Sequence, residues 1–145
     1  MWYHLGMRIA RGVVDTSVLY AGLYSAAGAS FQILRMIERR RLRPVLSTTL
    51  LFEYEEILSR DREDLGLSEA DIADVLDGLC NRGENRRIHF LWRPQLPDPK
   101  DDHVLELAVA AGGVDIITHN VKHFGAARAF GIRALTPSTA LRSLR

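Results

Sequence analysis

The sequence has very little cysteine and no long hydrophobic run. Cys80 is its single cysteine, which excludes an internal disulfide framework and a cluster of cysteine metal ligands. No apolar stretch approaches the ~20 residues that cross a bilayer. The first residues, MWYHLGM, lack the apolar core of a secretory signal. We therefore expect a protein of the reducing cytoplasm with no membrane partner.

The chain also has little net charge. Lysine and arginine total 19 against 18 aspartate and glutamate, which gives +1 at pH 7. Composition therefore gives no global preference for a polyanion. Two segments are nevertheless basic, residues 35–43 (RMIERRRLR) and 81–87 (NRGENRR). They are either solvated helix ends and turns or contacts for a polyanion such as nucleic acid.

What is present is the composition of a globular domain. The 145 residues are 47% hydrophobic and 26% charged, which suits one domain with a sizeable core. We expect residues 7–145 to form that single domain. Met7 offers an alternative start, so residues 1–6 are interpreted as an N-terminal extension.

Short apolar runs alternate with longer amphipathic ones, which is typical of a mainly parallel α/β sheet. Strands are predicted over residues 8–14, 43–46, 87–91, 115–118 and 133–135. Helices are predicted over 30–40, 48–59, from 68 to about 80, over 101–111, and from Pro137 onward. The expected N-caps are Thr48, Ser68 and Thr136. Gly112 and Gly113 end the fourth helix, and residues 93–100 form a proline-rich loop.

Asp15 is the most unusual polar residue, because it follows the apolar strand in the stretch GVVDTSVLY. A charge at the edge of a core costs several kcal/mol unless it is compensated. Ligands of open α/β sheets bind at the carboxyl ends of the strands. Asp101 and Asp102 follow the proline loop, and Asn120 follows the fourth strand. We expect these side chains to meet at one edge of the sheet.

Glu53 is a candidate on different grounds. At about 100° per residue, the helix over 48–59 has an apolar stripe made by Leu50, Tyr54, Ile57 and Leu58. Glu53 lies on the margin of this stripe, whereas Glu55 and Glu56 point toward solvent. Glu53 is therefore either a partly buried site residue or an ordinary solvated glutamate.

The same periodicity separates the two neighbouring aspartates. Asp101 shares a helix face with Val104, Leu105 and Ala108, which predicts that it points along the core side. Asp102 shares a face with Glu106, which predicts that it points toward solvent. Helix capping explains either aspartate but not both.

Carboxylates gathered at one place repel, and each raises the pKa of the others. A hard divalent cation relieves that repulsion, and Mg²⁺ takes one or two carboxylates together with water and substrate phosphate. Such an ion turns water into a nucleophile against a phosphodiester. We therefore predict that Asp15 is tolerated because it is a metal ligand.

Four segments in order, VVDTSVLYAGL, STTLLFEYEEIL, DPKDDHVLELAVAAGGVDIITHN and GIRALTPSTAL, resemble the PIN-domain family. The resemblance covers almost the whole chain from Met7 and is greatest to VapC-type toxins of toxin–antitoxin pairs. It implies a Rossmann-like three-layer α/β/α sandwich and an endoribonuclease that depends on Mg²⁺ or Mn²⁺. In the toxin branch it also implies a homodimer and a cognate antitoxin protein.

The resemblance implies specific site residues. Asp15 and Glu53 match the first two acidic positions, and the third falls in DPKDD. Periodicity selects Asp101 there, whereas counting back from Thr118 without a gap selects Asp102. We favour Asp101 and keep both as catalytic candidates. The expected metal ligands are Asp15, Glu53, Asp101 and Asn120, and the expected substrate contacts are Thr16, Ser17, Thr118, Asn120 and Arg93.

The chain departs from the family pattern at the fourth acidic position. Many PIN domains carry an aspartate where this chain has Asn120 or His123. Asn120 offers a neutral oxygen, so a second metal would bind weakly or only with substrate. His119 and His123 are expected to be surface histidines. The arginines of residues 39–43 are a further candidate contact for the RNA backbone.

Three functional hypotheses follow. The first is the metal-dependent ribonuclease. The second is a PIN-like module that binds RNA or a partner protein with little catalysis; Asn120 and the small net charge favour it, and a carboxylate cluster that repels phosphate argues against it. The third is another phosphate enzyme, such as an aspartyl phosphotransferase. Its second aspartate would be at Ser17, its basic residue would be Lys122, and GLYSAAG lacks the lysine and spacing of a P-loop.

Overall fold

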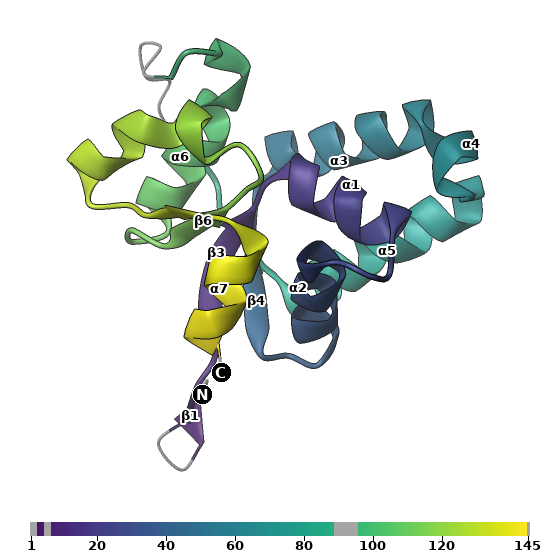
Figure 1. Ribbon diagram of the computed structural model, residues 1–145, viewed down its shortest axis with the longest axis horizontal. Coiled ribbons are helices and arrows are strands. Elements are labelled where there is room, and N and C mark those ends of the chain that lie inside the picture. The colour runs from purple at the N-terminus through teal and green to yellow at the C-terminus, as the bar shows by residue number, and fades with distance from the viewer. Residues whose placement is uncertain (1–2, 5–6, 89–95, 145) are drawn as a thin grey trace.

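The computed structural model describes residues 3–4, 7–88 and 96–144 (Figure 1). Within these ranges no helix combines the length and the apolar character needed to span a membrane. In chain order the elements are β1 (Tyr3–His4), β2 (Met7–Arg8), β3 (Ala10–Val14), α1 (Thr16–Tyr24), α2 (Ala29–Glu38), β4 (Leu42–Leu46), α3 (Thr48–Arg60), α4 (Arg62–Leu65), α5 (Glu69–Arg82), β5 (Glu84–Asn85), η1 (Pro99–Asp101), α6 (Asp102–Ala110), β6 (Asp115–Ile117), η2 (Val121–Phe130), β7 (Ala134–Leu135) and α7 (Pro137–Leu144).

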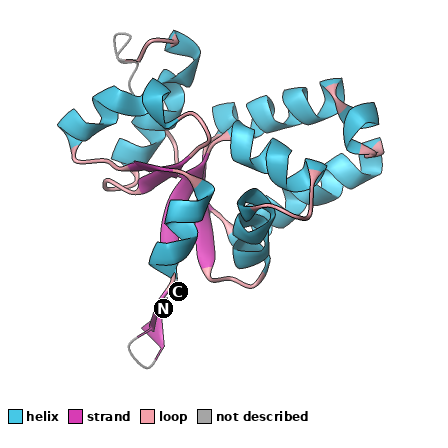
Figure 2. Ribbon diagram, viewed as in Figure 1, coloured by secondary structure: helices cyan, strands magenta, loops and turns pink. Residues whose placement is uncertain are grey.

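The central sheet has five parallel strands in the order β5-β4-β3-β6-β7. Helix α6 packs on β3, β4 and β6, while α2 and α7 pack on each other and on β4 and β7. Figure 2 shows helices on both sides of the sheet. This arrangement confirms the predicted three-layer α/β/α class. Strands β1 and β2 form a separate antiparallel pair outside this sheet.

The core is built from the apolar runs that predicted the strands. Val13 and Val14 of β3 and Val45 and Leu46 of β4 are almost completely buried, as expected for a parallel sheet covered on both faces. On α3 the predicted stripe is also confirmed, because Leu50, Tyr54 and Leu58 are buried while Ile57 is partly exposed.

Most of the predicted helix ends are confirmed. The Ser68 hydroxyl accepts from the backbone N of Asp71 at 3.0 Å, and the Asp71 carboxylate accepts from the backbone N of Ser68 at 2.9 Å, which completes a capping box. Gly112 and Gly113 follow α6 with φ of 95° and 91°, a region that glycine enters at no steric cost.

Two predicted details are wrong. The N-cap of α3 is Ser47, whose hydroxyl accepts from the backbone N of Leu50 at 3.1 Å, and Thr48 is the first helical residue. Strand β5 is Glu84–Asn85 rather than 87–91. Residues 87 and 88 are outside any strand, and 89–91 lie outside the described residues. The strand begins directly after Gly83, where Glu84 and Asn85 pair with Val45 and Leu46 of β4.

Within the described ranges, three helical segments have no counterpart in the sequence prediction: α1, α4 and η2. Helix α1 is apolar on more than one face, which hides the usual helical period. It also approaches α2 closely, since a Cβ on Gly22 would lie 2.6 Å from Leu34 Cδ1 and 3.0 Å from the carbonyl oxygen of Ser30. Packing between α1 and α2, rather than propensity, makes this segment a helix.

Glu84 joins the strands of the sheet at one edge. Its carboxylate accepts from Arg11 Nε at 2.9 Å, Arg11 Nη2 at 2.7 Å and Arg86 Nε at 2.6 Å, and it lies 3.9 Å from Arg43 Nη1. The hydrogen bond from Arg11 is the main cause that lowers the pKa of Glu84 from 4.5 to about 2, with burial opposing it and Arg86 assisting. Arg43 and Arg86 of the two basic segments are thus engaged in ion pairs.

We expect Glu84→Gln to lower the free energy of unfolding at pH 7 by about 1–2 kcal/mol, allowing for solvent screening. Because the pKa is lowered in the folded state, this stabilisation is present above pH 4.5 and is lost as the pH falls toward 2. Denaturant unfolding at pH 7 and pH 3 measures the difference. Glu69→Gln, which removes an exposed partner of Arg62, is the control and should change little. Equal losses in both variants would contradict the role of Glu84.

Candidate active site

The candidate site lies where the strand order of the sheet reverses, between β3 and β6. Asp15 directly follows β3 and Thr118 directly follows β6, and the backbone N of Asp15 donates to the carbonyl oxygen of Ile117 at 2.9 Å. The crevice at such a switch point is the usual ligand position in open parallel sheets. The sequence prediction placed Asp15 and Asn120 at this same edge.

Asp15 is only 7% exposed. Its Oδ2 accepts from Ser17 Oγ at 2.7 Å and from Thr118 Oγ1 at 2.8 Å, and the Thr118 oxygen in turn accepts from the backbone N of Asn120 at 2.9 Å. Asp15 also precedes α1, whose N-terminal dipole favours a negative charge. Two hydroxyls and a helix end therefore compensate the carboxylate that ends this apolar strand.

Glu53 reaches the same place from α3. The Thr16 hydroxyl donates to its Oε2, and His103 Nε2 donates to its Oε1 at 3.0 Å. Burial raises the pKa of Glu53, but the hydrogen bonds from His103 and Thr16 outweigh burial and hold the pKa below its ordinary value. Glu53 is therefore ionised and oriented at neutral pH, whereas Glu55 and Glu56 are exposed as predicted.

The burial of the two neighbouring aspartates is the reverse of the prediction from periodicity: Asp102 is the buried one and Asp101 the more exposed. Asp102 is 7% exposed and accepts from the backbone N of Leu96 at 3.0 Å, and Glu106 on its face is 5% exposed. Asp101 is the more exposed residue and borders the groove with Asp15 and Glu53. The predicted faces were wrong because α6 begins at Asp102, and Asp101 belongs to the 3₁₀ turn η1.

Asp101 experiences the charges of the other acidic residues. Burial is the largest cause that raises its pKa, followed by the negative charges of Asp15, Asp98 and Glu53, while His123 opposes the shift. His123 Nδ1 lies 4.0 Å from Asp101 Oδ2. Carboxylates from three separate parts of the chain are thus close enough to repel one another.

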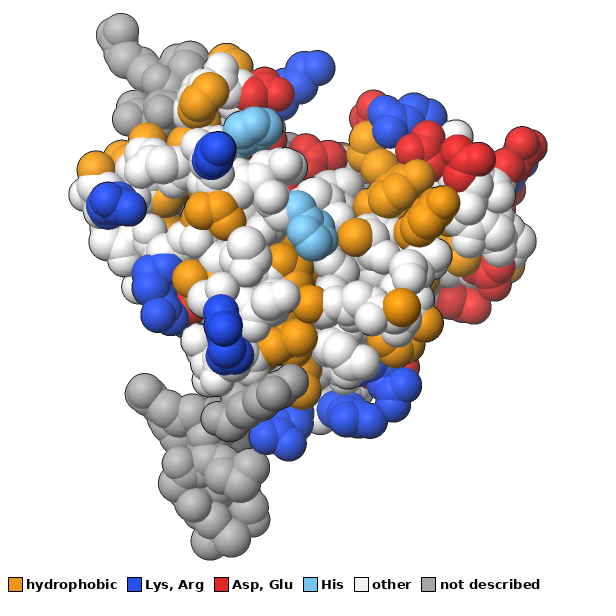
Figure 3. All heavy atoms as spheres, in the orientation of Figure 1, with side chains coloured by type: hydrophobic (Ala, Val, Ile, Leu, Met, Phe, Trp, Pro, Cys, Tyr) orange, Lys and Arg blue, Asp and Glu red, His pale blue; other side chains and the backbone are white. Residues whose placement is uncertain are grey.

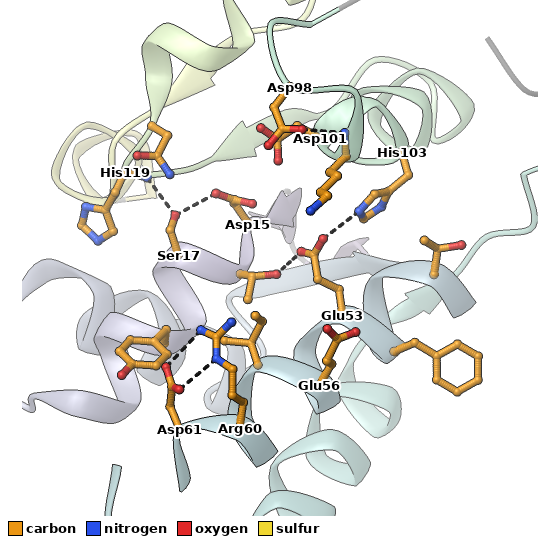
Figure 4. A pocket seen from close by; sticks show the side chains of 17 residues that line it. Asp15, Ser17, Glu53, Glu56, Arg60, Asp61, Asp98, Asp101, His103 and His119 are labelled. Atoms are coloured by element: carbon orange, nitrogen blue, oxygen red, sulfur yellow. Dashed lines mark hydrogen bonds and ion pairs between the residues drawn. The ribbon is translucent and has the colours of Figure 1, made fainter. Parts of the chain in front are cut away.

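These residues line an open groove of about 1070 Å³, which we call the site groove (Figure 4). Thr16, Ser17 and Asn120 also line it, and Thr118 lies buried beneath it. Asp102 is not part of its lining. Its acidic residues are Asp15, Glu53, Glu56, Asp61, Asp98 and Asp101, and its basic side chains are Arg60, Lys100, His103 and His119.

The arginines at positions 39–41 are placed away from the site groove. Residues 39–41 lie in the connection between α2 and β4, at the bottom of Figure 1, whereas the site groove lies at the upper ends of the strands. This position does not favour contact between the arginines of residues 39–41 and an RNA held in the site groove, and the RNA contact of this segment stays a prediction. Arg93 lies outside the described residues. His119 and His123 are exposed as expected, although His119 Nε2 shares a hydrogen bond with Ser30 Oγ at 2.6 Å.

Several lining residues were missed by the sequence analysis. His103 contacts Glu53, and Lys100 and Arg60 bring positive charge to the groove. No periodicity or motif distinguishes these residues from ordinary surface residues. The only available signal was proximity in sequence, since Lys100 and His103 flank the two aspartates of DPKDD.

The donor set suits a hard divalent cation, although the carboxylates are not gathered into a ready-made cage. In the described part of the chain, no three His, Cys, Asp or Glu side chains stand together closely enough to hold a metal ion. Mg²⁺, however, keeps several waters and usually takes only one or two carboxylates. One or two of the carboxylates of Asp15, Glu53 and Asp101, which border one groove, would meet that requirement, with water filling the other positions.

A comparison with protein-family models identifies the family. The model described as "PIN domain" matches residues 11–122, a span that runs from β3 past Asn120 and includes every acidic residue of the site groove. The chain belongs to the PIN-domain family. PIN domains are generally nucleases, so the protein is a nuclease-type hydrolase that acts on nucleic acid. Neither the curated proteins nor the solved structures gave a match.

Proposed function

We propose that this protein is an endoribonuclease that hydrolyses RNA phosphodiesters with the help of Mg²⁺ or Mn²⁺. The observation that supports the proposal most is the convergence of Asp15, Glu53 and Asp101 on one groove at the switch point of the sheet. Burial, together with the charges of Asp15, Asp98 and Glu53, raises the pKa of Asp101, and a bound cation would offset both effects.

One or two of the carboxylates of Asp15, Glu53 and Asp101 would hold the ion directly, and the others would contact it through water. When bound, it supplies Lewis-acid chemistry, activating water as a nucleophile and neutralising charge that develops on the phosphate. The hydroxyls of Ser17 and Thr118 orient Asp15, while Thr16 and His103 orient Glu53. Such outer hydrogen bonds fix the direction in which a carboxylate presents its oxygens.

Other groups of the groove suit an RNA substrate. Lys100 and Arg60 can contact phosphate oxygens, and Ser17 offers a hydroxyl beside Asp15. Asn120 supplies a neutral oxygen where a fourth carboxylate would add charge. The free protein would therefore bind one ion tightly, and a second ion would bind only together with the substrate.

The biological role proposed from the resemblance is that of a VapC-like toxin. A toxin of this branch acts as a homodimer and is neutralised by an antitoxin protein. The support for this role is the ordered set of sequence segments rather than any contact in the structure.

Cleavage of a labelled single-stranded RNA by the purified chain tests the proposal. We expect internal cleavage with Mg²⁺ or Mn²⁺, no cleavage in EDTA, and recovery when the ion is restored. Cleavage that persists in EDTA would contradict the metal requirement. A stable RNA complex that is never cleaved under any of these conditions would favour the alternative of a binding module, for which Asn120 is the supporting observation.

A further inference from the structure

Helix α1 carries an aromatic pair beside the site groove, with Tyr24 exposed and Tyr20 partly buried. The rings of Tyr20 and Tyr24 are stacked, with centroids 6.3 Å apart and planes inclined by 13°. Tyr24 is 64% exposed. Figure 3 shows hydrophobic side chains on the surface over α1, bordered by acidic ones. The exposed ring of Tyr24 is therefore available to stack on another ring.

The aromatic pair is continuous with the site groove. A second cavity of about 370 Å³ is lined by Tyr20, Tyr24, Ser30 and His119 among others. Two of these residues, Tyr20 and His119, also line the site groove. A chain molecule that occupies the groove can therefore extend over the two tyrosine rings without leaving the surface.

A second exposed ring lies on α3. Phe52 is 65% exposed and lines the site groove. It shares a face of α3 with Thr49, Glu56 and Arg60, all of which line the groove. Of the large hydrophobic residues exposed in the described part of the chain, Tyr24, Phe52 and Phe130, two border the site groove or its continuation.

The two aromatic positions lie toward opposite ends of the groove. Asp61 follows the C-terminal end of α3, nine residues beyond Phe52, which is about 13 Å along a helix. Tyr20 and Asp61 both line the groove, and burial together with the charge of Asp61 raises the pKa of Tyr20, so the tyrosine pair lies near that end. Figure 4 shows Arg60 and Asp61 at one end of the groove and His103 at the other, with Asp15 and Glu53 between them.

The groove carries more acidic than basic side chains, so binding of a nucleic acid there needs a contribution that does not depend on charge. Its six carboxylates outnumber Arg60 and Lys100, and the whole chain has a net charge of only +1. Phosphate attraction, which dominates most nucleic-acid binding, is therefore weak at this surface. Stacking of a base on an aromatic side chain contributes about 1–3 kcal/mol per base and does not depend on charge.

We infer that the site groove and the cavity continuous with it hold unpaired nucleobases at two stacking subsites, one on Tyr20 and Tyr24 and the other on Phe52, on either side of the acidic residues. The inference rests on the proposed nuclease function and adds to it the residues that bind the substrate. In this arrangement the affinity for RNA comes from stacking of its bases, and the carboxylates act in phosphodiester hydrolysis.

Binding of a fluorescein-labelled single-stranded RNA, measured by anisotropy in EDTA, tests the two subsites separately from cleavage. Tyr24→Leu and Phe52→Leu should each weaken binding about 5-fold or more, the lower limit set by one stacked base. Phe52→Trp should keep or strengthen binding. Phe130→Leu removes an exposed ring outside the groove and should leave binding unchanged. Circular dichroism checks that each variant keeps its fold.

An oligonucleotide with abasic sites isolates the contribution of the bases. It keeps the phosphates, so wild type should bind it more weakly, and the two leucine variants should bind it as wild type does. Unchanged RNA binding by both leucine variants would overturn the inference even if wild type cleaves RNA. If the leucine substitutions changed only the self-association of the protein, the rings would belong to a protein–protein contact, and the inference would also be overturned. RNA binding that depends on the rings, without any cleavage of RNA, would support the stacking subsites and overturn the proposed endoribonuclease activity.

Discussion

The Asp15→Asn variant should cleave RNA at least about 10²-fold more slowly than wild type while keeping its fold. A metal ion contributes several kcal/mol to the transition state, and each 1.36 kcal/mol is a factor of ten in rate. Asparagine retains a side-chain oxygen that can accept from Ser17 and Thr118. The Asp15 side chain makes no capping hydrogen bond to α1, so the substitution removes no hydrogen bond from the start of that helix.

Single-turnover cleavage rates and thermal unfolding in EDTA measure the two effects of Asp15→Asn. Asp77→Asn is the matched control, because it removes the same charge from an exposed position on α5. Equal slowing by both substitutions would show that the loss comes from general charge rather than from the site. A lower unfolding midpoint for Asp15→Asn alone would show that its carboxylate is structural.

Substitutions of the two neighbouring aspartates should separate catalysis from stability. Asp101→Asn should reduce cleavage strongly and leave the unfolding midpoint unchanged or raised at pH 7, because burial and the charges of Asp15, Asp98 and Glu53 disfavour its ionised form. Asp102→Asn should lower the free energy of unfolding by about 1–3 kcal/mol. It removes the charge from a buried group that accepts from the backbone N of Leu96.

The pH dependence of stability distinguishes the two variants further. Because the pKa of Asp101 is raised in the folded protein, the folded state binds this proton more tightly than the unfolded state does. The cost of ionising Asp101 is absent below its ordinary pKa of 3.8 and fully present above its raised value. The stability gained in Asp101→Asn should therefore appear only as the pH rises through that interval. A gain in the free energy of unfolding that is equal at all pH values would contradict the raised pKa of Asp101 in the folded protein.

The sequence predicts the parts of this structure that have a clear period or a clear stop signal. The apolar runs of β3, β4 and β6 and the stripe on α3 gave the sheet and the orientation of Glu53. The capping box at Ser68 and the glycine pair at 112 and 113 gave helix ends. Each of these is a local pattern that tertiary contacts reinforce.

The sequence fails where tertiary contacts or a change of helix type decide the outcome. Helix α1 is formed by packing against α2 around Gly22, which an apolar stretch alone does not reveal. The faces of Asp101 and Asp102 were exchanged because a 3₁₀ turn precedes α6. The contact of His103 with Glu53 joins residues 50 positions apart, and no pattern along the chain marks it.

Direct binding of Mn²⁺, followed by electron paramagnetic resonance without RNA, tests the central claim that these carboxylates hold a divalent ion. We predict saturable binding of about one ion per chain, consistent with the carboxylate and water coordination of such cations. Asp15→Asn and Glu53→Gln should weaken this binding strongly, while Asp77→Asn should not. If wild type shows no saturable binding, or all variants bind Mn²⁺ equally, the groove is not a metal centre and the proposed mechanism is wrong.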